Sequence, residues 1–151
     1  MERTSIDETT QGNWQSSYGS DGYYIININP TDPVDSIYLP EYVDSVEISG
    51  EPSGRNGRWY FGANPGDPFL LQNGYDGEVP NWIGIYYGDE KVTATVYMND
   101  DKAHQVALYM VEELENVRSQ DVQFFDLEGN PISDVATVDN FKDGKYVVCN
   151  V

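Results

Sequence analysis

Basic residues are scarce in this chain of 151 residues, which contains eight Lys and Arg against 26 Asp and Glu and has a net charge of −18. Nucleic acid is a poor partner for such a chain, because no stripe of cations is present to displace the counterions of the phosphates. Polyanionic glycans would be repelled as well, unless a bound cation bridged the charges. The acidity therefore favours an uncharged partner, or serves solubility or adaptation to a salty medium.

Residues for metal binding and nucleophilic catalysis are nearly absent. Cys149 is the single cysteine, which excludes a disulfide framework and a cysteine-based metal site. His104 is the single histidine, so neither a catalytic triad nor a histidine metal site can be assembled. A glycosidase needs only two carboxylates, but in a chain with 26 acids a suitably spaced pair carries no information. We therefore expect no enzymatic activity and no required cofactor.

Long hydrophobic runs are missing too. No stretch is apolar enough to cross a membrane, so we expect no membrane insertion. Residues 1–13, MERTSIDETTQGN, are polar and do not form a signal peptide. The protein is then either cytosolic or a module excised from a larger multidomain protein with its leader removed. An initiator Met before a polar lead-in suits the excised module, and we expect that origin.

The longest nearly unbroken apolar stretch is residues 103–111, AHQVALYMV. In an extended chain Val106, Leu108 and Met110 lie on one side, and apolar residues also occupy the other, as in a strand covered on both faces. An amphipathic helix fits the local pattern almost as well. The neighbouring stretches 91–97 (KVTATVY) and 121–127 (DVQFFDL) favour a strand. We expect three successive antiparallel strands here.

Turn residues elsewhere divide the chain into short segments about ten residues apart, a rhythm typical of β-sandwiches. The sequence predicts an all-β fold, an antiparallel, jelly-roll-like β-sandwich. Residues 1–12 are expected to be a disordered or linker-like lead-in, and residues 13–151 a single domain. Further strands are predicted at residues 23–28, 45–49, 59–62, 68–72, 82–87, 132–138 and 145–151, and a short helical turn at residues 39–43.

Several stretches, in their order along the chain, resemble a known family: residues 14–23 (WQSSYGSDGY), 39–42, 58–61 followed by 67–68, 102–109, 118–119 and 146–151. They resemble a β-sandwich accessory module of secreted bacterial glycoside hydrolases and related extracellular polysaccharide-degrading proteins. The resemblance covers about residues 14–151. It implies a non-catalytic carbohydrate-binding module, located outside the cell or at its surface, with a polysaccharide or oligosaccharide as its partner.

Aromatic side chains are the candidates for sugar binding, because sugar rings present flat C–H faces that stack on Trp and Tyr. Tyr75 is expected at a loop tip and Trp82 at a strand edge, whereas Trp59 alternates with Phe61 and suggests core. Arg118 is a candidate contact to a ligand hydroxyl, or the partner of Glu112 or Glu115. The full candidate set is Tyr75, Trp82, Tyr87, Tyr60, Trp14 and Arg118.

Acidic residues near the stretch 23–28 are candidates for a structural Ca²⁺ site, because Ca²⁺ takes six to eight oxygen ligands from such loops. They are Asp21, Asp32 and Asp35. No EF-hand spacing is present, and solvated loop carboxylates are the alternative.

A second function fits the same fold. The chain would then be a structural or adhesive extracellular β-sandwich, such as a surface or filament subunit without a sugar site. Its aromatic residues would be buried between subunits.

Overall fold

The computed structural model describes residues 1–26, 34–51, 58–72, 82–88, 90–113 and 117–151. This part of the chain is all-β with antiparallel strand pairs, apart from an isolated parallel bridge between Glu2 and Ser133 and one turn of 3₁₀ helix, η1 (Trp14–Ser16). The predicted fold class, all-β and antiparallel, is confirmed. None of the described helices has the length and apolar character needed to span a membrane.

The chain forms two compact units. The terminal unit comprises Met1–Tyr18 and Lys102–Val151, and the central unit comprises Gly19–Asp101. The strands of the terminal unit are β1 (Ser5–Asp7), β8 (Gln105–Met110), β9 (Ser119–Val122), β10 (Ala136–Asp139) and β11 (Lys145–Asn150). Those of the central unit are β2 (Tyr23–Ile25), β3 (Ser36–Tyr38), β4 (Val43–Glu51), β5 (Arg58–Gly62), β6 (Trp82–Tyr86) and β7 (Lys91–Met98).

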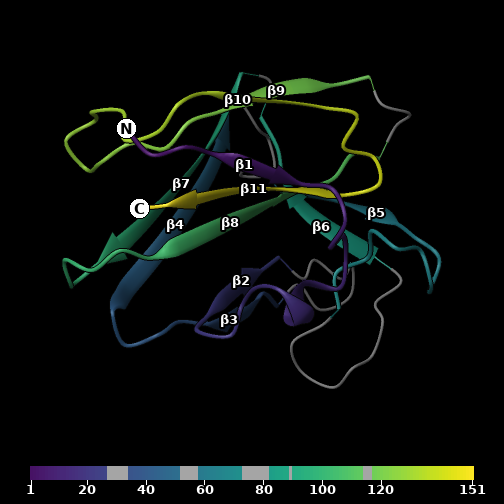
Figure 1. The fold of residues 1–151 in the computed structure, drawn as a ribbon. Helices are drawn as coiled ribbons and strands as arrows, with labels where there is room; N and C mark the ends of the chain where they lie inside the picture. Colours follow the sequence, from purple (N-terminus) through teal and green to yellow (C-terminus); the bar gives the residue numbers. More distant parts are fainter. Residues whose placement is uncertain (27–33, 52–57, 73–81, 89, 114–116) are drawn as a thin grey trace. The chain divides into compact units, whose positions relative to one another are not determined.

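In the terminal unit, β11 lies between β1 and β8 in a three-stranded sheet (Figure 1). β11 is buried along most of its length, and the core forms where Val147 packs with Ala136, Val138 and Phe141. β10 alternates buried and exposed residues, as expected for a strand with one face on a core. β9 and β10 form a separate ladder.

Three residues of the predicted lead-in form strand β1. Ser5–Asp7 pair with β11, and Lys145 forms an ion pair with Glu8 at 2.5 Å. The Asp7 carboxylate accepts hydrogen bonds from Thr9, Thr10 and Tyr18. Composition alone suggests a polar tail, but these local bonds and the free edge of β11 supply the interactions that order it.

The central unit consists of the ladders β2–β3, β4–β7 and β5–β6. Its most buried apolar residues include Phe61, Leu70 and Ile83. The predicted strand at residues 68–72 is wrong, because residues 68–70 form a turn in which the Leu70 N–H bonds to the Asp67 carbonyl. Residues 41–42 are also a turn, closed by a bond from the Val43 N–H to the Pro40 carbonyl, in place of the predicted helical turn.

The stretch 103–111 contains β8, so the strand prediction there is confirmed and the helix alternative is wrong. The predicted pairing with its two neighbours is wrong. β7 pairs with β4, β8 with β11, and β9 with β10. Composition identifies strands, but partners are chosen by contacts between residues far apart in sequence.

Gly144 should be intolerant of a side chain. It has φ +83° and its N–H bonds to the Phe141 carbonyl, and a Cβ atom here would lie 2.0 Å from the Tyr109 hydroxyl oxygen. We expect Gly144→Ala to destabilise the protein by about 2–4 kcal/mol through backbone strain plus overpacking. Gly129→Ala is the matched control, because Gly129 has φ +86° and no atom within 4 Å of a Cβ. Equal losses of unfolding free energy for the two variants, measured in urea, would contradict the close approach of Tyr109 to Gly144.

The contribution of Asp7 to the free energy of unfolding should depend on pH. Burial opposes ionisation, but the hydrogen bonds from Thr10, Thr9 and Tyr18 outweigh it and hold the pKa of Asp7 far below its usual 3.8. The carboxylate therefore stabilises the folded state fully when the pH is above the usual pKa of 3.8, and this stabilisation is lost as the pH falls from there toward the lowered pKa of the folded state. We expect the stability difference between wild type and Asp7→Asn to shrink between pH 5 and pH 2 in urea unfolding. Asp139→Asn controls for the lost charge, and a difference independent of pH would contradict the role of Asp7.

Candidate functional site

The β5–β6 ladder brings aromatic and charged side chains onto one face. In its register Arg58 is opposite Tyr86, and Tyr60 is opposite Gly84. Because side chains alternate along a strand and directly opposed residues share a face, every second residue belongs to the same surface. This surface, called the mixed face below, is formed by Arg58, Tyr60, Gly62, Trp82, Gly84 and Tyr86.

The opposite face of this ladder belongs to the core. Phe61 and its cross-strand partner Ile83 are 6% and 5% exposed. Burial of this pair fixes the register, since a slip by one residue would put Tyr60 and Trp82 inside. The hydrophobic pattern of the two strands thus determines which side chains face outward.

Trp82 and Tyr60 form an aromatic corner on the mixed face. Trp82 is 39% exposed, and the centroids of the two rings are 5.5 Å apart at an interplanar angle of 77°. The Trp82 ring lies over Gly62, where a Cβ atom would be 3.6 Å from it. The centroid of the neighbouring Trp59 ring lies 6.0 Å from that of Tyr60, and the two rings are nearly parallel. A ligand ring stacked on Trp82 would meet the Tyr60 ring beside it, because Tyr60 and Trp82 are nearly perpendicular.

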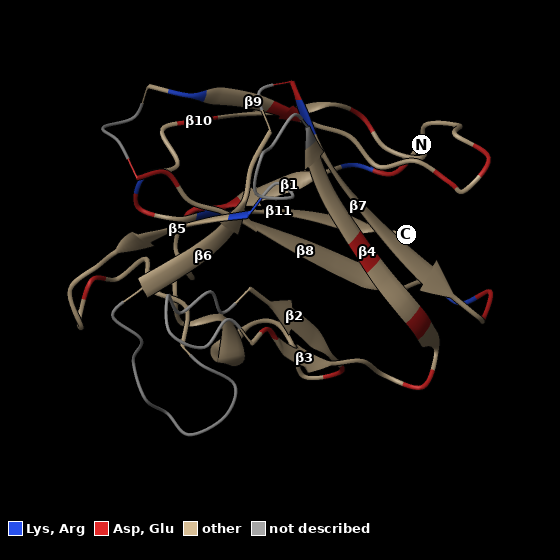
Figure 2. Ribbon diagram, turned by 180° about the vertical axis from the view of Figure 1, so that it is seen from behind, with Lys and Arg blue, Asp and Glu red and all other residues tan. Residues whose placement is uncertain are grey.

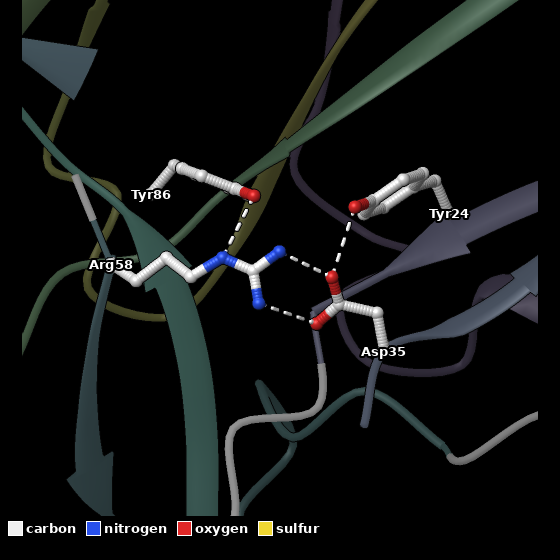
Figure 3. Close-up of polar contacts among 4 residues, drawn as sticks. All are labelled: Tyr24, Asp35, Arg58 and Tyr86. Atoms are coloured by element: carbon white, nitrogen blue, oxygen red, sulfur yellow. Dashed lines mark hydrogen bonds and ion pairs between the residues drawn. The ribbon is translucent and has the colours of Figure 1, made fainter. Parts of the chain in front are cut away.

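An ion pair occupies the other end of the mixed face (Figure 3). Arg58 Nη1 and Nη2 donate to the two carboxylate oxygens of Asp35 at 3.2 and 2.5 Å. Arg58 Nε donates to the Tyr86 hydroxyl at 2.8 Å, and the Tyr24 hydroxyl donates to Asp35 Oδ2 at 2.9 Å. Asp35 directly precedes β3 and Tyr24 lies on β2, so this cluster joins the β2–β3 ladder to the β5–β6 ladder.

Burial and charge act together in this cluster. The Asp35 side chain is only 9% exposed, and that of Arg58 is 31% exposed. Burial, followed by the hydrogen bond to the Asp35 carboxylate, raises the pKa of the Tyr24 hydroxyl. For Arg58, burial is outweighed by the bonds to Asp35 and Tyr86, which raise the pKa of the guanidinium. Both groups therefore remain protonated hydrogen-bond donors at neutral pH.

The mixed face is free of acidic residues even though the chain is strongly acidic. β5 (RWYFG) and β6 (WIGIY) contain no Asp or Glu, and Asp35 compensates the single cation. Figure 2 shows acidic segments on β4, whereas β6 is tan throughout. An uncharged ligand can approach this face without a specific electrostatic penalty.

The predicted sugar-binding residues are only partly brought together. Tyr60 and Trp82 are adjacent on the mixed face, and Tyr87, partly buried, directly follows β6. Tyr75 lies outside the described residues. Trp14 is 6% exposed in η1 of the terminal unit, so its ring has no free face for a sugar, and its prediction as a contact is corrected.

Arg118 is exposed in the terminal unit. Glu112, proposed as its partner, is 2% exposed and accepts the Val117 N–H with Oε1 at 3.0 Å instead. The ion-pair prediction for these two residues is wrong, and Glu115 lies outside the described residues. The buried Glu112 carboxylate therefore makes a local contact, with the backbone five residues further along the chain.

The Ca²⁺ prediction does not fit Asp35, because the Arg58 guanidinium occupies the position that a cation would need. Asp21 accepts weak hydrogen bonds from Ser20 and Tyr42 at 3.3 and 3.5 Å. Asp32 lies outside the described residues. Across the described ranges, no three His, Cys, Asp or Glu residues gather closely enough to hold a metal ion.

Sequence reasoning missed Arg58, Tyr24 and Tyr86 as site residues. The rarity of cations made Arg58 as conspicuous as Arg118, and its place directly before Trp59 and Tyr60 was the available signal. The sequence alone does not reveal the register that sets Arg58 opposite Tyr86. It also does not reveal the fold that brings Asp35 to Arg58.

Comparisons of the chain with protein-family models, curated proteins and solved structures yield no match.

The Arg58–Asp35 pair should be strongly coupled in a double-mutant cycle of Asp35→Asn and Arg58→Gln. We expect a coupling energy of about 1–3 kcal/mol in urea unfolding, because Asp35 is mostly buried while Arg58 retains some solvent. The control cycle uses Lys145 and Glu8, whose carboxylate is 62% exposed, and should give about 0–1 kcal/mol. Coupling no larger than in this control would contradict the structural role assigned to the pair.

Proposed function

We propose that this chain is a non-catalytic carbohydrate-binding module that attaches a larger extracellular protein to a neutral polysaccharide. The observation that carries the proposal is the mixed face, where the exposed ring of Trp82 and the partly buried ring of Tyr60 share a surface with a polar cluster without uncompensated charge. Tyr60 and Trp82 would stack on a sugar ring, and Arg58 and Tyr86 would bond to its oxygens. The jelly-roll-like sandwich expected from strand spacing belongs to the same proposal.

The expected affinity is modest. Each aromatic stack contributes about 0.5–1.5 kcal/mol, so two stacks with a few hydrogen bonds give a dissociation constant of roughly micromolar to millimolar. Such affinity suits a tether, since a polysaccharide offers many identical sites and the parent protein can carry several modules.

A second candidate function, an adhesive or structural subunit, is favoured by a different observation. Phe125 and Leu127 are 52% and 66% exposed on a hairpin tip in the terminal unit. The tip is ordered by bonds from the Asn130 backbone and side chain to the Asp126 carboxylate at 2.7 and 2.9 Å. Rigid exposed apolar groups suit a protein contact. Sedimentation velocity tests this candidate: self-association abolished by Phe125→Ser with Leu127→Ser would support it, and a monomer at all concentrations would contradict it.

Removing the aromatic corner should weaken sugar binding. We expect Trp82→Ala and Tyr60→Ala each to lower the affinity for a bound neutral glycan about 2- to 12-fold, the equivalent of one stack. Isothermal titration against glucan, mannan, xylan and galactan oligomers measures the effect. Phe125→Ala is the matched control, because it removes a more exposed ring from the terminal unit and should leave affinity unchanged. Unaltered binding by Trp82→Ala, or equal loss in the control, would contradict the assigned site.

A further inference from the structure

The unused hydrogen-bonding capacity of the Arg58 cluster lies on its donors. A guanidinium has five N–H groups, and the cluster uses three of them, one on Tyr86 and two on Asp35. In the described part of the chain, the remaining two N–H groups have no protein acceptor. The Tyr86 hydroxyl accepts from Arg58 Nε, and its own O–H can donate either to the neighbouring Tyr24 oxygen or to a ligand. Figure 3 shows the Tyr86 oxygen beside the guanidinium and the Tyr24 oxygen beside the Asp35 carboxylate.

Both oxygens of the Asp35 carboxylate, the charged acceptor of the cluster, are already engaged. Asp35 Oδ1 accepts from Arg58, and Oδ2 accepts from Arg58 and Tyr24. The Asp35 side chain is 9% exposed, so little of it is available to a ligand. A ligand at this end of the mixed face would therefore meet donors and find few acceptors.

This asymmetry selects among ligand groups. A sugar hydroxyl both donates and accepts, and a donor-rich surface leaves its proton without a protein partner. A carbonyl oxygen only accepts, and it matches the surface fully. A carboxylate also only accepts, but Asp35 already neutralises Arg58 and the chain carries a charge of −18, so a neutral carbonyl is favoured over an anion.

The spacing on the mixed face fits such a group. Tyr60 is opposite Gly84, and Tyr86 is two residues further along the strand, which makes Tyr60 and Tyr86 diagonal neighbours. Diagonal neighbours in an antiparallel ladder are about 7–8 Å apart. That distance spans a sugar ring and the carbonyl of its substituent. A ring stacked on Tyr60 would thus direct its substituent toward the donors of Tyr86 and Arg58.

We infer that the site prefers neutral acetamido sugars, with the ring on the Tyr60–Trp82 corner and the acetamido carbonyl accepting from the Tyr86 O–H and the free Arg58 N–H groups. The inference rests on the proposed function. It adds a substrate class that the aromatic residues alone do not specify, because stacking is tolerant of ring substituents.

Paired ligands test the inference by isothermal titration. Chitotetraose and cellotetraose share their backbone linkage and differ in an acetamido or a hydroxyl group at one ring position, and oligomers of N-acetylgalactosamine and galactose form a second pair. Wild type should bind the acetamido member of at least one pair about 3- to 10-fold more tightly, as expected for one additional hydrogen bond. Equal affinities within both pairs would overturn the inference and leave sugar binding intact. Binding of none of the four would overturn the inference, and it would overturn the proposed function as well only if mannan and xylan oligomers were not bound either.

The variant Tyr86→Phe keeps the ring and removes the O–H donor. It should lose about 3- to 10-fold in affinity for the acetamido ligand and lose less for the hydroxyl ligand, so that the preference between the two shrinks. Tyr38→Phe, which removes the hydroxyl of a 55% exposed tyrosine on β3, is the matched control and should change neither. Thermal unfolding of both variants reports whether the fold is kept. Unchanged selectivity in a folded Tyr86→Phe variant would overturn the assignment of the preference to this cluster.

Discussion

The ion pair between Arg58 and Asp35 is the interaction on which the central unit depends most. Two-stranded ladders are marginal by themselves, and this pair links the segment before β3 to the start of β5. Asp35 is almost fully buried, so loss of Arg58 would leave a buried charge without a counterion. In a chain with only eight basic residues, one of them is used here to hold two ladders together.

The same pair sets the chemistry of the mixed face. It neutralises the cation, engages both oxygens of the carboxylate and leaves donors on Arg58 and Tyr86, which share the mixed face with the rings of Tyr60 and Trp82. The burial of Phe61 and Ile83 on the reverse side keeps these groups facing outward. Under the proposed function, structural and binding roles coincide, because the contact that stabilises the unit would also determine which ligand groups this face accepts.

The sequence predicted those features that depend on local pattern. Apolar alternation and turn residues located β4 to β8 and β11 within a few residues, and Trp82 and Tyr60 were identified as binding candidates. Pairing was not predictable, because β11 lies between β1 and β8 through contacts that span nearly the whole chain. The Arg58–Asp35 pair is non-local in the same way. Trp14 was misjudged because its burial depends on the packing of the terminal unit.

The most direct test of the account is a nuclear magnetic resonance titration with a neutral oligosaccharide that binds. The indole N–H signal of Trp82 and the Nε–H signal of Arg58 report on the two ends of the mixed face, and the buried indole of Trp14 is an internal control in the other unit. The account predicts that the Trp82 and Arg58 signals shift together and saturate at one dissociation constant, while the Trp14 signal stays in place. Saturable shifts confined to other residues would contradict it.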